Sequence, residues 1–298
     1  MRRPSPLAAG ARVALLAPAG PLRGPVDVAT GEANARSLGW EPRTGAHVLD
    51  RHGYFAGRDA DRLADLNRAL RDDAIDAVWC LRGGYGIMRL LDGVDYDAVR
   101  RRPKPLIGFS DITALHAALA READLVTLHG PVARNPLTPL TRASLICATA
   151  QRGDPCGRAP GPRTIRGGRA SGRLAGGNLA LLAALAGTRW APRFDGAVLL
   201  LEDVNEAVYR MDRMLVQLRL AGMLDGVRAI VFGQCTDCPE DSGDGRRTLD
   251  DVLAETADAL RVPCLAGIPL GHVEDQWTFP LGMDAEVDAD GGTVHVLE

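Results

Sequence analysis

The chain has 298 residues, of which 46% are hydrophobic, 24% charged and 4% aromatic, and its formal net charge is −3. This length accommodates two domains or one large one, and the hydrophobic content supports a proper core. The near balance of acidic and basic residues argues against a nucleic-acid partner, and no stretch approaches the ~20 apolar residues of a membrane-spanning helix.

Cysteine usage and the N-terminus bear on the cell compartment. Six scattered cysteines do not resemble the disulfide framework of a small secreted domain. The first 20 residues have the basic, apolar and small residues of a signal peptide, but Arg12 interrupts the apolar part, and the segment equally fits a first buried strand. We expect a cytoplasmic protein with no metal and no cofactor. Cys235 and Cys238 have the spacing of half a zinc site, but the other cysteines supply no second pair, so a role for these two stays open.

Strand-like and helix-like segments alternate in the first half of the chain. This alternation predicts an α/β domain with a parallel, doubly wound sheet, which we place at residues 1–150. The helix at 61–72 is amphipathic, with Leu63, Leu66 and Leu70 on one face. The expected strands are 12–20, 74–81, 105–109 and 125–131, and the other expected helices are 26–38 and 111–122.

A segment rich in Gly, Pro and Arg follows at 151–172, and its composition predicts a linker. A second, smaller α/β domain is predicted at 173–298. Its sequence indicates a capped helix at 176–188, buried strands at 196–203 and 227–235, a long helix at 209–224 and a β-hairpin at 285–297 that turns at Asp-Gly-Gly.

Ser110 stands at the corner between the strand at 105–109 and the helix that follows. A serine in this position commonly caps the helix. Alternatively, it is a nucleophile held on a tight turn at the carboxyl edge of the sheet, where α/β proteins bind ligands. The second reading needs oxyanion donors, and we expect them to be the backbone N–H groups of Gly84, in the glycine-rich RGGYG turn, and of Asp111. Ile112 replaces the second glycine of the α/β-hydrolase elbow, which argues against that fold.

A serine nucleophile requires a base and a carboxylate that orients the base. His272, in a loop after Pro-Leu-Gly, and His129, after a strand, are both candidates for the base. Glu202 ends a buried strand, where a carboxylate is costly unless it is paired, and Glu206 is the alternative four residues on.

Substrate recognition by such an enzyme calls for groups that bind a carboxylate. A planar guanidinium suits this task, and the candidates are Arg82, beside the oxyanion glycines, and Arg210, after Glu202. Tyr85, in the same turn as Arg82, is a further candidate for substrate binding.

Several blocks of the sequence, taken in order, resemble the LD-carboxypeptidases, a family of serine peptidases with a Ser-Glu-His triad. The resemblance extends from about residue 12 to about residue 290, and blocks in the right order are more specific than any one motif. The blocks are LAPAGP, FAGRDADRLADLNRAL, VWCLRGGYGIMRLLDGVDYD, KPLIGFSDITALH, LHGP, GGNLALLAALAGT, LLLEDVNEAVYRMDRMLVQL and GIPLGHVEDQWTFPLGMDAEV.

The resemblance implies a cytoplasmic enzyme of peptidoglycan recycling, commonly a homodimer, that hydrolyses the L,D-peptide bond and releases terminal D-alanine from murein tetrapeptide. By position, it assigns Ser110 as the nucleophile, Glu202 as the acid and His272 as the base. It also implies a Rossmann-like N-terminal domain and a C-terminal domain that contributes the Glu and the His.

Two alternatives stay open from the sequence. A branch of the family, the microcin C self-immunity proteins, uses the same triad on aminoacyl or acyl-sulfamoyl adenylates, and Trp277 offers a ring that could stack on adenine. The second alternative is a binding protein.

The block VNEAVYRMDR departs from the family pattern, because Asn205, Ala207 and Val208 stand where members usually carry Gly and Pro. The non-enzyme alternative is a two-domain protein that binds a small ligand, in which Ser110 only caps a helix.

Overall fold

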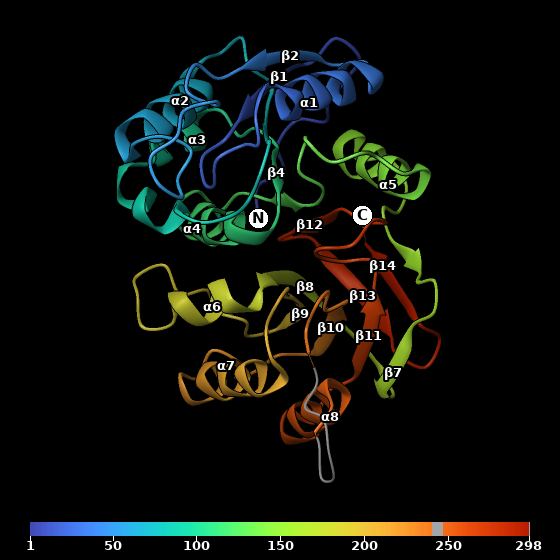
Figure 1. Ribbon diagram of the computed structural model, residues 1–298. Helices are drawn as coiled ribbons and strands as arrows, with labels where there is room; N and C mark the ends of the chain where they lie inside the picture. Colours follow the sequence, from blue (N-terminus) through green and yellow to red (C-terminus); the bar gives the residue numbers. More distant parts are fainter. Residues whose placement is uncertain (240–246, 298) are drawn as a thin grey trace. The chain divides into compact units, whose positions relative to one another are not determined.

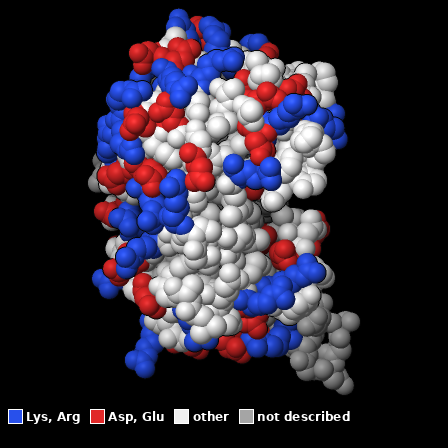
Figure 2. All heavy atoms as spheres, turned by 90° about the vertical axis from the view of Figure 1, so that its left-hand side faces the viewer, with Lys and Arg blue, Asp and Glu red and all other residues white. Residues whose placement is uncertain are grey.

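The computed structural model describes residues 1–239 and 247–297 (Figure 1). The chain divides into two compact units, Met1–Gly153 and Asp154–Glu298. Within the described residues, no helix has both the length and the apolar character needed to cross a membrane. On the face shown in Figure 2, basic and acidic side chains are mixed, as the near-zero net charge leads one to expect.

The sheet of the first unit has its strands in the order β5-β4-β3-β1-β2, and every neighbouring pair is parallel. The chain proceeds from β1 to one side of the sheet and from β3 to the other, so the carboxyl ends of β1 and β3 form the topological switch point, where such sheets bind ligands. The predicted doubly wound parallel sheet is therefore confirmed. The strands are β1 (Arg12–Leu16), β2 (Glu41–Thr44), β3 (Ala77–Cys80), β4 (Leu106–Gly108) and β5 (Thr127–His129).

Helices cover this sheet, and α2 illustrates why they form. Leu66 and Leu70 are buried on its inner face as predicted, whereas Leu63 is only partly buried. Acidic residues stand in its first turn and basic residues in its last, which complements the helix dipole. The helices are α1 (Pro25–Ser37), α2 (Asp59–Arg71), α3 (Tyr96–Arg101), α4 (Thr113–Ala123) and α5 (Pro139–Ala150), with short 3-10 turns at Ile87–Arg89, Leu91–Gly93 and Ser110–Ile112.

The second unit has a mixed sheet in the order β6-β14-β13-β8-β9-β10-β11-β7. Strands β8 to β11 are parallel, and the strands on either side of them are antiparallel. The predicted C-terminal hairpin is present as β13 and β14. The strands of this sheet are β6 (Gly157–Arg158), β7 (Arg163–Arg166), β8 (Arg169–Asn178), β9 (Ala197–Glu202), β10 (Ala229–Gly233), β11 (Cys264–Ile268), β13 (Asp284–Asp288) and β14 (Thr293–Val296). The unit also contains β12 (Phe279–Leu281), which does not belong to this sheet.

Two helices of the second unit begin at side-chain caps. Asn178 caps α6 by accepting the N–H of Leu181, as the predicted capped helix requires. Thr248 and Asp251 form a reciprocal capping box at the start of α8. The helices are α6 (Leu179–Leu185), α7 (Val208–Leu220) and α8 (Leu249–Leu260).

The expectation of a linker at 151–172 is corrected by the structure. This segment contains β6, β7 and the first residues of β8, and from Asp154 onward it belongs to the second unit. Gly172, at the end of the segment, is required inside the sheet: a Cβ there would lie 2.3 Å from the backbone oxygen of Gly196 in the neighbouring chain segment. At Gly172 the glycine therefore marks close backbone approach in a strand, not a flexible connection.

The departure from the family pattern at Asn205 and Val208 has a local explanation. Asn205 has a φ of 58°, a left-handed conformation that glycine adopts freely and that asparagine tolerates better than most residues. Val208 is the first residue of α7, a position where proline is favoured but not required. The backbone that Gly and Pro favour is thus retained with other residues.

Candidate functional site

Ser110 lies on a strained turn directly after β4. Its φ of 65° falls in the left-handed region, which costs a non-glycine residue ~1–3 kcal/mol. The helix-capping alternative is not supported, because neither the 3-10 turn at Ser110–Ile112 nor α4 has a side-chain cap. The hydroxyl is therefore held on a sharp strand-to-helix turn, the conformation that presents a nucleophile at a sheet edge.

Glycines of the RGGYG turn pack closely against this serine. A Cβ on Gly83 would lie 2.8 Å from the Cβ of Ser110 and 3.1 Å from its Oγ, so no larger residue fits without displacing the serine. Gly84 has a φ of +108°, and a Cβ there would lie 2.9 Å from the Cα of Gly20. The turn after β3 thus reaches the Ser110 turn by backbone alone, which is the arrangement that the expected N–H donor at Gly84 needs.

Asp111, whose N–H is the second expected oxyanion donor, has a buried side chain. Its carboxylate accepts the backbone N–H of Ile87 at 2.8 Å, which ties the segment after the glycine-rich turn to the serine turn. Burial raises the pKa of Asp111 to about 6, against the opposing effect of its backbone hydrogen bonds. The side chain is thus engaged in holding the two turns together.

Glu202 and His272 meet in the second unit. Glu202 is the last residue of β9 and is fully buried, and its Oε2 lies 2.9 Å from Nδ1 of His272. With the carboxylate ionised, Nδ1 donates the hydrogen bond and the proton-accepting lone pair is on Nε2. Glu206 instead forms an ion pair with Arg210 at 3.6 Å, so the pairing favours Glu202 over Glu206 as the orienting carboxylate.

Two residues that the sequence analysis missed hold this pair. A Cβ on Gly271 would lie 2.5 Å from Oε2 of Glu202, so only glycine allows the loop of His272 to approach the carboxylate. The hydroxyl of Thr236 donates to the backbone carbonyl of His272 at 2.7 Å. The sequence did contain signals for both. Gly271 stands directly before His272, and Thr236 stands between Cys235 and Cys238, where the spacing of the two cysteines was the feature considered.

Asp203, next to Glu202, is a third residue that the sequence analysis missed. Its carboxylate accepts the N–H groups of Ala180 and Val204 at 2.9 and 2.8 Å, and the amide of Asn178 at 3.2 Å. Burial raises the pKa of Asp203 to about 6, and the negative charge of Glu202 adds to the rise. These bonds tie the start of α6 to the end of β9 and fix the strand end that carries Glu202.

The expected substrate-binding residues have different surroundings. Arg82 is partly buried, and its Nη1 donates to the carbonyl of Pro21. Tyr85 is half exposed and stacks on Phe55, with ring centroids 5.6 Å apart. Arg210 lies on the surface and contacts Tyr209 and Glu206. Of the two arginines, Arg82 has the more sheltered guanidinium.

Among the other residues considered in the sequence, His129 and Trp277 are buried. Trp277 is 4% exposed, and its ring packs edge-on against Phe279 at 6.1 Å, so the expectation of a ring available to stack on adenine is wrong. Cys235 contacts Met211, with 3.4 Å between the two sulfur atoms.

Comparison with known proteins places these features in a family. Models described as the LD-carboxypeptidase N-terminal and C-terminal domains match residues 13–130 and 171–287. The murein tetrapeptide carboxypeptidase of Pseudomonas aeruginosa is 37% identical over 94% of this chain and 94% of its own. The microcin C7 self-immunity protein of Escherichia coli is 28% identical over 82% of this chain and 80% of its own.

A solved structure extends the likeness to three dimensions. The muramoyltetrapeptide carboxypeptidase from Oxalobacter formigenes matches with a TM-score of 0.85 and 29% sequence identity, covering 96% of this chain and 97% of that one. The sequence blocks, the two matched domain models and the relatives along the full length agree. The chain belongs to the LD-carboxypeptidase family.

Proposed function

We propose that this protein is a serine carboxypeptidase that hydrolyses the L,D-peptide bond of murein tetrapeptide and releases terminal D-alanine. The observation that carries the proposal is the pairing of fully buried Glu202 with Nδ1 of His272, because it orients an imidazole as a base. The strained turn at Ser110, packed against glycine, adds a candidate nucleophile. The relatives named for murein peptides support the substrate class.

The proposed reaction proceeds in two halves. Ser110 Oγ attacks the carbonyl carbon of the scissile bond while His272 Nε2 takes its proton, and the N–H groups of Gly84 and Asp111 stabilise the oxyanion. The imidazolium, held by Glu202, then gives the proton to the amine of the departing D-alanine, and the C–N bond breaks. In the second half, water attacks the acyl-enzyme ester, its proton passes to His272 and then to Ser110, and the shortened peptide leaves.

Binding of the substrate is assigned to Arg82, Tyr85 and Arg210. A guanidinium can hold a carboxylate with two parallel hydrogen bonds, and partly buried Arg82 suits this task better than surface Arg210. Tyr85 offers an exposed ring next to the glycine-rich turn. A cytoplasmic location and a homodimer, which the family resemblance implies, stay predictions, and sedimentation of the purified protein measures the latter.

The test is incubation of the purified protein with murein tetrapeptide and, separately, with an aminoacyl-sulfamoyl adenylate, followed by mass spectrometry of the products. We expect release of D-alanine from the tetrapeptide and no release in Ser110→Ala. Cleavage of the adenylate alone favours the microcin-type alternative, which the likeness to the self-immunity protein supports. Buried Trp277 weighs against it.

A serine-directed fluorophosphonate reagent separates an enzyme from a binding protein. We expect labelling at Ser110 that is lost in His272→Ala, because the base activates the hydroxyl. Tetrapeptide binding without any labelling of Ser110 would point to a binding protein.

A further inference from the structure

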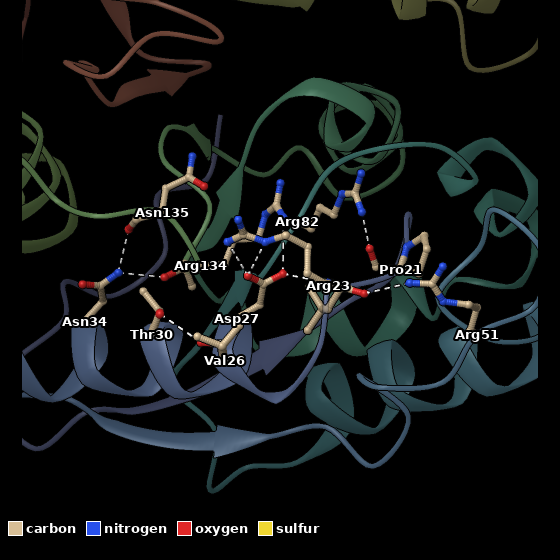
Figure 3. Close-up of polar contacts among 12 residues, drawn as sticks. Pro21, Arg23, Val26, Asp27, Thr30, Asn34, Arg51, Arg82, Arg134 and Asn135 are labelled. Carbon is tan, nitrogen blue, oxygen red and sulfur yellow. Dashed lines mark hydrogen bonds and ion pairs between the residues drawn. The ribbon is translucent and has the colours of Figure 1, made fainter.

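A cluster of arginines surrounds one carboxylate at the switch point of the first sheet. Asp27, near the start of α1, is fully buried, and the guanidinium of Arg23 binds its Oδ1 through two nitrogens, at 3.0 and 2.7 Å. Nη1 of Arg134, which follows β5, lies 3.3 Å from its Oδ2 (Figure 3). Arg82, two residues after β3, interacts electrostatically with Asp27 and, repulsively, with Arg51. Two arginines thus bind one carboxylate, and two further arginines interact with this group.

Like charges face one another in this cluster. The guanidinium groups of Arg134, Arg23 and Arg51 all act on Arg82, and Asp27 is the opposing charge among them. Burial lowers the pKa of Arg82, and repulsion from Arg134, Arg23 and Arg51 adds to this effect. Burial alone would raise the pKa of Asp27, but the hydrogen bonds from Arg23 and Arg134 outweigh it and hold the pKa below its usual range. An anion bound beside Arg82 would offset the repulsion between these guanidinium groups.

Donors remain for such an anion. Within residues 1–153, Arg82 makes one hydrogen bond, from Nη1 to the carbonyl of Pro21, although a guanidinium has five N–H groups. Nε of Arg134 is buried and has no hydrogen-bond partner among the described residues. A buried donor without an acceptor is costly, and the 22% of the Arg134 side chain that stays exposed is the part that a bound carboxylate can reach.

The cluster is also rigid. The side-chain amide of Asn34 on α1 donates to the carbonyls of Ala133 and Asn135 at 2.8 and 2.7 Å, which fixes the segment that carries Arg134 (Figure 3). The N–H of Gly20 donates to Gly83 at 2.9 Å, which joins the loop after β1 to the turn of Arg82. The same turn packs against Ser110, so the cluster belongs to the carboxyl edge that carries the proposed nucleophile.

We propose that Arg134 and Arg82, held by Asp27, form a subsite that binds the free carboxylate of the residue that the enzyme removes. This inference rests on the proposed function. It makes Arg134, which no sequence motif indicated, a specificity-determining residue, and Asp27 a positioning residue that acts through Arg134. The subsite selects peptides that end at the departing residue over peptides that continue.

The experiment measures binding without turnover. In a Ser110→Ala background, calorimetry compares murein tetrapeptide with its C-terminal amide, which has the same shape but no charge at that end. We expect the free acid to bind ten- to a hundredfold more tightly than the amide, as charge-assisted hydrogen bonds allow. Arg134→Gln and Arg82→Gln each reduce this preference to about threefold or less by weakening acid binding alone.

Two controls keep the outcome decisive. Arg36→Gln removes an exposed arginine that pairs with Glu32 on the same helix as Asp27, and it leaves the preference unchanged. Arg82→Gln keeps both ion pairs of Asp27, so it tests the subsite even if Arg134→Gln does not fold. Equal binding of acid and amide to the parent, or a full preference in both variants, overturns the subsite. Release of D-alanine by the wild-type enzyme is measured separately, so the proposed function stands or fails independently.

Discussion

The imidazole of His272 is held through Nδ1 by Oε2 of Glu202, 2.9 Å away, on a carboxylate with no solvent exposure. A buried carboxylate in this position fixes both the ring orientation and the tautomer of the histidine. Gly271 leaves room for the loop of His272 to reach Glu202, and the hydroxyl of Thr236 holds the backbone carbonyl of His272. Together with the hydrogen bond to Glu202, these contacts fix the position of the imidazole.

We first predict that Glu202→Gln lowers kcat roughly 10³- to 10⁴-fold with little change in KM. The amide keeps the size of the side chain but removes its charge, and its NH₂ group can donate to Nδ1, which would place the proton on Nε2 and block the base. The measurement is steady-state release of D-alanine. Glu206→Gln, which affects only an ion pair with Arg210, is the matched control and should leave kcat within about threefold of wild type. A kcat for Glu202→Gln close to wild type would contradict the role of the pair.

The second prediction concerns the interdependence of the proposed nucleophile and base. Ser110→Ala and His272→Ala should each lower kcat by about 10⁴ or more, and the double variant should be little worse than either. Groups that act as a unit lose their effect together. Single and double variants are compared in the same D-alanine assay. Losses that multiply would show that the two residues contribute separately.

Third, we predict that Thr236→Val lowers kcat about tenfold, whereas Thr236→Ser keeps it near wild type, because only the hydroxyl donates to the carbonyl of His272. The readout is the profile of kcat over several pH values, measured for both variants in the same D-alanine assay. Cys235→Ser changes the adjacent side chain without removing this bond and serves as the control. Identical profiles for the Val and Ser variants would contradict a positioning role.

The fourth prediction concerns acid stability. His116 is buried, and its Nε2 lies 2.9 Å from the carbonyl oxygen of Gly108; burial lowers the pKa of His116 to about 4. Between pH 6.5 and 4, His116 is protonated in the unfolded chain but stays neutral in the folded protein. The free energy of unfolding therefore falls as the pH drops from 6.5 to 4, by up to about 3 kcal/mol from this residue.

His116→Leu should remove this part of the pH dependence. Urea unfolding of both proteins at pH 7, 5.5 and 4.5 gives the difference between them, in which the contributions of other groups cancel. A constant difference across this pH range would contradict the assignment.

The sequence predicted the parallel sheet and the strand ends correctly because apolar runs and glycine turns are local signals. Ser110 at the end of β4 and Glu202 at the end of β9 were found in this way. The linker was predicted wrongly because the segment contains short strands, and composition alone does not distinguish a glycine that allows close packing in β8, such as Gly172, from a glycine in a flexible connection.

Other features depend on contacts between distant segments. Arg134 and Asp27 are separated by more than 100 residues and have no shared motif, so nothing in the sequence associates them. The burial of Trp277 likewise follows from packing around it, not from its position five residues after His272.

The left-handed turn at Ser110 implies that this protein is less stable than its fold permits. Glycine adopts a φ of 65° without steric cost, whereas serine and alanine do not. Ser110→Gly should therefore melt a few degrees above Ser110→Ala, corresponding to about 1 kcal/mol, although both variants lack the hydroxyl. If so, the serine at this position lowers thermal stability in return for a hydroxyl that glycine cannot provide. Selection for thermostability without an activity screen would then tend to replace Ser110 first.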